Sequence, residues 1–303
     1  MATNPAHFLR ATLITAIAVG YLSNPARADS TMNAVHKFAH AANAGWINLR
    51  PDVPAAPAGI VFGEYFLSGQ AYAANLGWID FGDGAPADGI RYANNSGADC
   101  GVNHDGSGNL SGFAYGANVG WINFGWATSS DPDRPRVDLL TGAFTGYAYS
   151  ANLGWIQLGT GYLTTDTMVS VDSDSDGIAD AWERQVFGDL ATANAMSNWD
   201  GDASSDKEEY LAATLAKDAS SHFGILSVIY NSDHTGANVT FTSSPGRLYD
   251  LEVSNNLGIA PDMWLDSGLG VITPDTGVST TRSVSWLGTD RKFVRVVAQR
   301  PLQ

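Results

Sequence analysis

Oxygen-bearing side chains recur at a regular spacing in one short acidic stretch of the chain. Over residues 172–183, carboxylates occupy positions 1, 3, 5, 9 and 12 of a twelve-residue loop. Alternate residues of a tight loop point toward one cation, and a carboxylate at position 12 can close the shell with both oxygens. Gly177 falls at position 6, where the chain must turn sharply. The predicted ligands are Asp172, Asp174, Asp176, the carbonyl of Ile178, Asp180 and Glu183.

A second stretch, over residues 198–209, repeats this pattern with two departures. Asn198 replaces Asp at position 1, and Ala203 replaces Gly at position 6. Both loops offer oxygen atoms only, which suits a hard cation that takes six to eight oxygen ligands. We therefore expect one Ca²⁺ in the first loop and a second Ca²⁺ in the second. The predicted ligands of the second loop are Asn198, Asp200, Asp202, Ser204, Asp206 and Glu209.

The charge of this stretch supports a bound cation. Residues 172–209 contain eleven acidic residues and two basic ones, Arg184 and Lys207. Such a density of like charge repels itself unless a counter-ion is present. The alternative is a solvated acidic linker, but random acidic runs rarely match every ligand position of a calcium loop.

Each loop is predicted to lead into a short helix. Apolar residues spaced by four are typical of one helical face, and Gly188 can end the first helix. Residues 164–171 are predicted to be strand or loop, so no helix precedes the first loop. The apolar positions are Ile178, Trp182 and Val186 in the first stretch, and Leu211 and Leu215 in the second.

A loop followed by a helix, present twice, resembles dockerin and thrombospondin type 3 calcium modules more than a complete EF-hand. The resemblance implies that the ion is mainly structural. Extracellular modules of this kind bind calcium at about 10⁻⁴ to 10⁻³ M, because millimolar calcium is available outside cells.

A ten-residue motif recurs four times in the first half of the chain. Each copy alternates aromatic and small residues and then reads Ala-Asn-x-Gly-Trp, and an Ile follows each Trp. Asn and Gly tolerate the positive φ that a hairpin turn needs, so each copy is predicted to be a β-hairpin. Neighbouring hairpins must pack together, and a solenoid, a sandwich and a closed barrel all satisfy this requirement. The copies cover residues 37–46, 69–78, 112–121 and 146–155.

The motif tryptophans admit two interpretations. We interpret them as core residues, because aromatic side chains dominate core burial. The alternative is that they form exposed platforms for sugar rings, in a polysaccharide-binding protein or a polysaccharide-acting enzyme. Over residues 33–160, the motif resembles a Gly-Trp-Ile repeat of secreted bacterial proteins, and that resemblance implies no activity.

The C-terminal part is predicted to be a small β-sandwich. Alternating segments separated by turn residues recur from residue 222 onward. The Pro-Gly-Arg-x-Tyr sequence at 245–249 and the Phe-x-Arg-Val sequence at 293–296 resemble the ends of a C-terminal module common in secreted bacterial proteins. That resemblance implies a spacer, docking or adhesion role.

The first 28 residues resemble a secretory signal peptide. Arg10 precedes a short apolar run over residues 11–22, and Ala26-Arg27-Ala28 has the small-x-small cleavage pattern. The run is short for a bilayer span, although an N-terminal anchor is the alternative. We expect no membrane span in the remainder, and a secreted, extracellular or cell-surface location, with the periplasm as an alternative.

Composition limits the fold class and the partners. The 303 residues carry a formal net charge of −15, with 16 Lys and Arg against 31 Asp and Glu, which disfavours nucleic-acid binding. The 33 glycines and low charged fraction favour turn-rich β structure. A single cysteine, Cys100, excludes an intrachain disulfide. We expect a mainly β fold: a repeat-built β domain over 29–163, a small α calcium-loop segment over 164–221 and a β-sandwich over 222–303.

Catalytic motifs are missing from the sequence. There is no Gly-x-Ser-x-Gly, no His-Glu-x-x-His and no phosphate-binding Gly-rich loop with Lys, so we expect no enzyme. One alternative is a surface or periplasmic protein that binds copper or zinc through His36, His40 and His104, together with Cys100. This set remotely resembles bacterial surface copper-binding proteins.

The sequence thus predicts a secreted or cell-surface calcium-binding protein without enzymatic activity. Calcium would act structurally between two β modules. The expected role is binding or adhesion, with an extracellular protein or a glycan as partner. The oligomeric state does not follow from the sequence.

Overall fold

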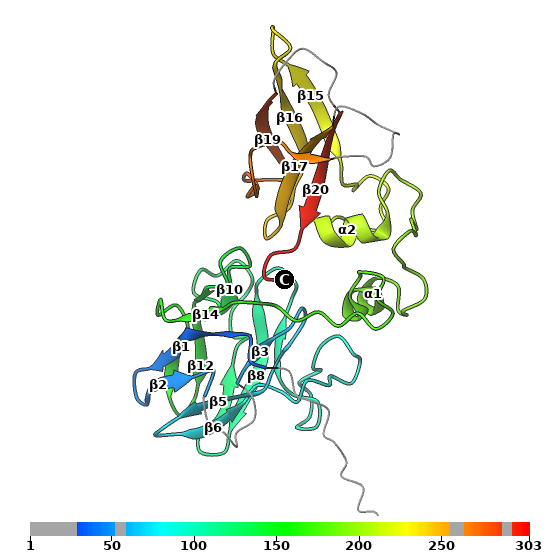
Figure 1. Ribbon diagram of the computed structural model, residues 1–303. Helices are drawn as coiled ribbons and strands as arrows, with labels where there is room; N and C mark the ends of the chain where they lie inside the picture. The colour runs from blue at the N-terminus through cyan, green and yellow to red at the C-terminus, as the bar shows by residue number, and fades with distance from the viewer. Residues whose placement is uncertain (1–28, 52–58, 255–263, 287–292) are drawn as a thin grey trace, which may run out of the picture.

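The computed structural model describes residues 29–51, 59–254, 264–286 and 293–303 (Figure 1). The signal peptide predicted over residues 1–28 lies outside the described residues. The described chain contains twenty strands and two short helices. The expected mainly β fold with a small helical segment is therefore confirmed.

Four hairpins form one closed ring of eight strands. Each copy of the ten-residue motif supplies one antiparallel hairpin, and consecutive hairpins pair side by side in chain order. A pairing between the first and last strands of the set closes the ring, so its strands have no open edge. The ring strands are β1 (Met32–Ala41), β2 (Gly45–Asn48), β5 (Gln70–Ala73), β6 (Gly77–Asp80), β8 (Leu110–Gly116), β9 (Gly120–Asn123), β12 (Tyr147–Ser150) and β13 (Gly154–Gln157).

Small and branched apolar residues fill the inside of the ring. Successive residues of a strand face opposite sides, so the Ile that follows each motif Trp faces inward while the Trp faces outward. An eight-stranded ring has an interior just wide enough for such side chains. The buried inward residues include Ala39, Ala71, Ala114, Ala148, Ile47, Ile79, Ile122 and Ile156.

The interpretation of the motif tryptophans as core residues is wrong. Their side chains are between 36% and 52% exposed. On the outside of the ring of strands, each motif Trp packs against an aromatic residue of the same hairpin, at ring-centroid distances of 4.8–5.0 Å. The pairs are His40–Trp46, Tyr72–Trp78, Tyr115–Trp121 and Tyr149–Trp155.

The asparagines of the motif join the four hairpin turns in a cycle of hydrogen bonds. Each Asn side chain donates from Nδ2 to a backbone carbonyl in the turn of the preceding hairpin, and the first copy donates to the last. The predicted positive φ is found only at the motif glycines, so the Asn is required for this contact and not for its own backbone conformation. The bonds are Asn43 to Leu153 (3.1 Å), Asn75 to Ala44 (3.1 Å), Asn118 to Leu76 (3.0 Å) and Asn152 to Val119 (2.7 Å).

Six further strands cover the ring, and their apolar residues join its core. Phe62, Leu67 and Leu163 are fully buried in the same cluster as the inward-facing residues of the ring. We call strands β1–β14 together the ring module. The covering strands are β3 (Val61–Phe62), β4 (Leu67–Ser68), β7 (Val102–His104), β10 (Arg136–Val137), β11 (Phe144–Thr145) and β14 (Leu163–Thr165).

Strands β15–β20 form a second body, the sandwich module, with its own core. Two three-stranded antiparallel sheets, β15-β16-β19 and β18-β17-β20, enclose the buried side chains of Val239, Phe241, Tyr249 and Leu251. The strands are β15 (Ile225–Tyr230), β16 (Gly236–Thr242), β17 (Leu248–Ser254), β18 (Leu265–Asp266), β19 (Ser279–Ser285) and β20 (Phe293–Gln299).

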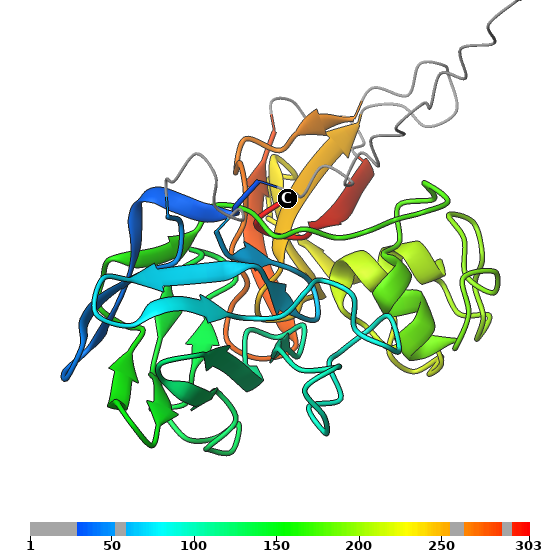
Figure 2. The same ribbon diagram turned by 90° about the horizontal axis from the view of Figure 1, so that it is seen from below.

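Both helices lie in the chain that connects the two modules. α1 (Asp180–Val186) lies at the side of the ring module, and α2 (Asp206–Ala212) lies beside α1, against β20 of the sandwich module (Figures 1 and 2). Ile178, Ala193 and Tyr210 form a small separate core between them, with Trp182 and Phe187 at its edge. We call residues 172–209 the acidic segment.

Candidate metal centre

The first loop of the acidic segment gathers three carboxylates. Oxygens of Asp172, Asp174 and Asp176 lie within 4.8 Å of one another. Backbone N–H groups of Ser175 and Gly177 donate to Asp172 at 2.8 and 2.9 Å, and these bonds curl the loop around the acidic side chains. Both donors have positive φ, at 63° and 91°, which explains why Gly is favoured at position 6 of this loop.

Glu183 of α1 feels the charge of the first-loop aspartates, although it is not in the group of three whose oxygens lie within 4.8 Å of one another. Its side chain is fully buried, and neither carboxylate oxygen has a hydrogen-bond partner. One oxygen of Asp176 is also buried without a partner. Burial, together with the charge of the nearby aspartates, raises the pKa of Glu183 to about 7. A buried and unpaired carboxylate is costly, and a cation among these oxygens would remove that cost.

The second loop gathers carboxylates from positions 3, 5 and 12. Oxygens of Asp200, Asp202 and Glu209 lie within 4.8 Å of one another. Asn198 accepts a hydrogen bond from Gly201 N at 2.8 Å, which matches the bond from Ser175 N to Asp172 in the first loop. In both loops the residue at position 7 donates its N–H to the carboxylate at position 5, at 2.6–2.7 Å. The two loops therefore share these backbone-to-side-chain hydrogen bonds.

Glu209 takes the place of Glu183 in the second loop. Its side chain is fully buried; one oxygen accepts a hydrogen bond from Thr214 Oγ1 at 3.1 Å, and the other has no partner. Burial raises the pKa of Glu209 to about 8, and the charges of the neighbouring aspartates add to the shift. One buried carboxylate oxygen without a hydrogen-bond partner is also found in each of Asp200, Asp202 and Asp206.

The departure at Ala203 does not distort the second loop. Ala203 is not among the residues with positive φ, whereas Gly201, at position 4, has φ 75°. The left-handed residue common to both loops is therefore at position 4, where the first loop carries Ser175. An alanine at position 6 is compatible with this backbone.

Three predicted ligands make other contacts. Asp180 accepts hydrogen bonds from the N–H and the hydroxyl of Ser173, both at 2.7 Å, and it is absent from the close group of the first loop. Asp206 likewise accepts from Trp199 N at 3.0 Å. The hydroxyl of Ser204 bonds the backbone of Phe223, so only its carbonyl remains for a cation. Position 9 of such loops often reaches the ion through water, which fits Asp180 and Asp206.

A lysine links the two loops. Lys207, at the start of α2, donates from Nζ to the backbone carbonyl of Asp176 at 2.8 Å. A residue of the second loop therefore holds the backbone of the first loop through its ammonium group. This contact and the small core at Tyr210 make the acidic segment one packed unit.

The histidines of the copper or zinc alternative are not brought together. His104 is fully buried; its Nδ1 donates to the Glu64 carbonyl at 2.7 Å and its Nε2 accepts from Gly108 N at 2.9 Å. Burial lowers the pKa of His104 to about 4. His36 packs against Tyr162 and His40 against Trp46. Over the described ranges, the two groups with metal-ligand spacing contain only Asp and Glu.

A buried polar junction next to the acidic segment was not predicted from the sequence. Arg300, after β20, pairs with Glu64 of the ring module at 3.0 Å, and both side chains are buried. Tyr210 of α2 donates its hydroxyl proton to Glu64 at 3.1 Å and also contacts Arg300. Ser170 accepts from Arg300 at 3.0 Å. These residues are far apart in the sequence and follow no motif, so only the folded chain reveals them.

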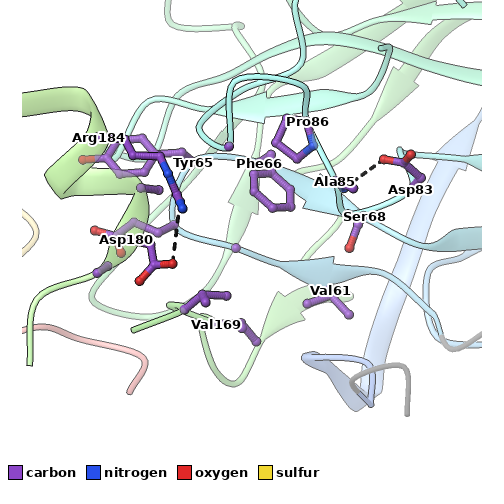
Figure 3. A pocket seen from close by; sticks show the side chains of 17 residues that line it. Val61, Tyr65, Phe66, Ser68, Asp83, Ala85, Pro86, Val169, Asp180 and Arg184 are labelled. Carbon is purple, nitrogen blue, oxygen red and sulfur yellow. Dashed lines mark hydrogen bonds and ion pairs between the residues drawn. The ribbon is translucent and has the colours of Figure 1, made fainter. Parts of the chain in front are cut away.

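A pocket of about 360 Å³ separates α1 from the ring module (Figure 3). Asp180 and Arg184 of α1 form an ion pair at 3.6 Å on one wall. The rest of the lining is mainly apolar and includes Val61 and Phe66 of the ring module, with Glu64, Ser68 and Asp83 as its polar members. The position of α1, and hence the shape of this pocket, depends on the loop that precedes the helix.

No family model, curated protein or solved structure matches the chain. Among the described residues, no helix has the length and apolar character that crossing a membrane requires.

Proposed function

We propose that the chain is a calcium-binding, non-enzymatic binding protein that acts outside the cytoplasm. The observation that carries the proposal is the pair of fully buried glutamates, Glu183 and Glu209, each with an oxygen that has no hydrogen-bond partner. Oxygens of Glu209, Asp200 and Asp202 lie within 4.8 Å of one another, and the charges of the first-loop aspartates act on Glu183. Buried carboxylates are normally paired or bound to metal, and the described contacts give these two no cationic partner.

The donor set favours calcium over other cations. Both loops offer oxygen atoms only, which disfavours zinc and copper, since these metals take imidazole or thiolate ligands. A carboxylate at position 12 that can bind through both oxygens suits the larger coordination shell of Ca²⁺ better than the strict octahedron of Mg²⁺. Asp172, Asp174, Asp176 and Glu183 would hold one ion. Asn198, Asp200, Asp202 and Glu209 would hold the other.

The role of calcium is structural. Two bound ions would neutralise the acidic segment and fix α1 and α2 against one another. α2 carries Tyr210, which contacts Glu64 of the ring module and Arg300 of the chain beyond the sandwich module. A calcium-loaded segment would therefore hold the two β modules in one arrangement and present them together to an extracellular partner.

The proposal is tested by calcium titration of the purified protein in a calorimeter. We expect two ions per chain. Glu183→Gln should remove one of them, because it deletes the anionic end of the first loop. The matched control is Asp189→Asn, since Asp189 is an exposed acid of the same segment that caps Ala191 and Thr192. A wild-type chain that binds no calcium at millimolar concentration would overturn the proposal.

A further inference from the structure

Four rows of side chains face outward around the ring module, each crossing three neighbouring strands. A row consists of a polar residue, an aromatic residue directly opposite it, and a motif Trp opposite that aromatic residue. The rows are Asn48–Tyr72–Trp78, Asp80–Tyr115–Trp121, Asn123–Tyr149–Trp155 and Gln157–His40–Trp46.

The row that contains Asp80 differs from the others in its polar residue. It carries a carboxylate where the other three rows carry a side-chain amide. It also lies beside two adjoining hollows of about 490 and 340 Å³, which share Gly97, Cys100, Phe113 and Trp121. We call this feature, formed by Asp80, Asp83 and Cys100 with Phe113, Tyr115 and Trp121, the aromatic groove.

Three aromatic rings and two carboxylates define the chemistry of the aromatic groove. Trp121 is 49% exposed and Tyr115 is 45% exposed, so their ring surfaces are available to a ligand. Tyr115 and Phe113 contact Trp121 at ring-centroid distances of 4.8 and 6.0 Å, with the ring planes inclined by 57° and 70°. Such inclined rings present their negative faces in more than one direction.

The charge of the groove favours a cationic ligand. Asp80 and Asp83 line it, and none of the described lining residues is Lys, Arg or His. The chain as a whole carries a formal charge of −15. Aromatic faces attract cations through their quadrupole, and they favour weakly hydrated quaternary ammonium groups in particular. A primary ammonium is strongly hydrated and needs the carboxylates more than the rings.

We propose that the aromatic groove binds a trimethylammonium group. The rings of Trp121, Tyr115 and Phe113 would contact the methyl groups, and Asp80 would supply the opposite charge. A neutral sugar is the weaker candidate, because its hydroxyls can hydrogen-bond the amides of the other three rows as well as a carboxylate, whereas only a cation gains from the negative charge that distinguishes this row. This inference gives the proposed binding role a ligand class, and it rests on that role.

The test is calorimetric titration with tetramethylammonium chloride and with 3,3-dimethylbutan-1-ol, which has nearly the shape of choline without its charge. We expect the cation to bind at least about tenfold more tightly than the alcohol. Choline and a trimethyl-lysine peptide then identify which source of the group binds better. Equal binding of the alcohol, or tighter binding of a neutral oligosaccharide, would overturn the proposal.

Matched variants locate the site. Asp80→Asn converts this row into the type that the other rows carry, and we expect it to weaken binding about tenfold. Trp121→Ala should abolish binding, whereas Trp155→Ala, which changes an equally exposed Trp of another row, should leave it intact. Equal losses in the two tryptophan variants would contradict the assignment to this groove.

Calcium binding is measured in the same samples, so the two proposals can fail separately. A chain that binds two calcium ions but no tetramethylammonium refutes the aromatic groove alone. A chain that binds tetramethylammonium in EDTA and never binds calcium refutes the calcium proposal alone.

Discussion

Two glutamates dominate the electrostatics of the acidic segment. Glu183 and Glu209 are fully buried among aspartates, and burial raises their pKa values to about 7 and about 8. Without a cation, ionisation of either glutamate in the folded chain lowers the free energy of unfolding. With a cation, the same burial excludes water and strengthens the attraction between ion and ligand.

These raised pKa values set the pH dependence of calcium-free stability. Between pH 4.5 and about 8 the two glutamates bind more protons in the folded chain than in the unfolded chain, because their folded pKa values lie above the ordinary value of 4.5. The free energy of unfolding in EDTA should therefore fall as pH rises through this range. Buried His104, whose pKa is lowered to about 4, opposes part of this effect below pH 6.5, so the trend is clearest above pH 6.5. Thermal melting at several pH values measures it.

Calcium should reverse that trend. Each ion needs the glutamate of its own loop deprotonated, so the affinity for calcium should rise over the same pH range. The double variant Glu183→Gln/Glu209→Gln is the control and should lose most of the pH dependence in EDTA. Identical melting profiles in EDTA for the variant and the wild type would contradict this explanation.

Sequence spacing anticipated most of the acidic clusters. It predicted the grouping of Asp172, Asp174 and Asp176, which the structure brings together. It did not predict that Asp180 and Asp206 would bond the backbone at position 2 of their loops. Those contacts depend on how each loop meets its helix, and the type and spacing of residues do not encode that.

At the scale of elements, the hairpin is the unit of the ring module. The alternation of apolar residues predicts each hairpin, and it also shows that Trp121 and Ile122 cannot both face inward. Assigning the tryptophans to the core relied on residue type and overlooked this alternation. Closure of the ring could not be predicted, because it depends on the curvature accumulated over eight strands.

The cycle of Asn contacts should stabilise the ring measurably. Asn118→Ala removes the hydrogen bond to the Leu76 carbonyl, and we expect it to lower the free energy of unfolding by about 1 kcal/mol. Urea denaturation measures the change. Asn95→Ala, at an exposed position outside the turns, serves as control and should change stability by less than about 0.5 kcal/mol.

At the scale of the whole molecule, the buried pair of Glu64 and Arg300 connects the segment after β20 to the ring module. Arg300 follows the last strand, and Leu302 packs against the core of the ring module. Met168 N donates to the Leu302 carbonyl at 2.5 Å. The chain therefore returns to its first module after completing the second.

Breaking this pair should be costly. Arg300→Met leaves Glu64 buried without its cation, and we expect a loss of about 3–5 kcal/mol in the free energy of unfolding. The exposed pair of Arg295 and Glu252 is the matched control, and Arg295→Met should cost less than about 1 kcal/mol. Equal effects in urea denaturation would show that the buried pair contributes no more than a surface pair.

Removal of calcium should loosen the connection between the modules. We expect EDTA to lower the melting temperature and to increase protease cleavage between residues 163 and 221, because the unpaired carboxylates repel one another. Asp176→Ala should reproduce much of this effect in the presence of calcium. Mass spectrometry of the fragments locates the cuts, and an unchanged digestion pattern in EDTA would count against the structural role.

The closing contact between β13 and β1 restricts how this protein can evolve. An open array of repeats tolerates the duplication or deletion of one unit, since each unit needs only its neighbours. A closed ring does not, because a fifth hairpin would widen the circumference beyond what alanine and isoleucine can fill, and three hairpins would crowd them. Copy number in descendants of this gene should therefore stay at four, even where the intervening loops vary in length.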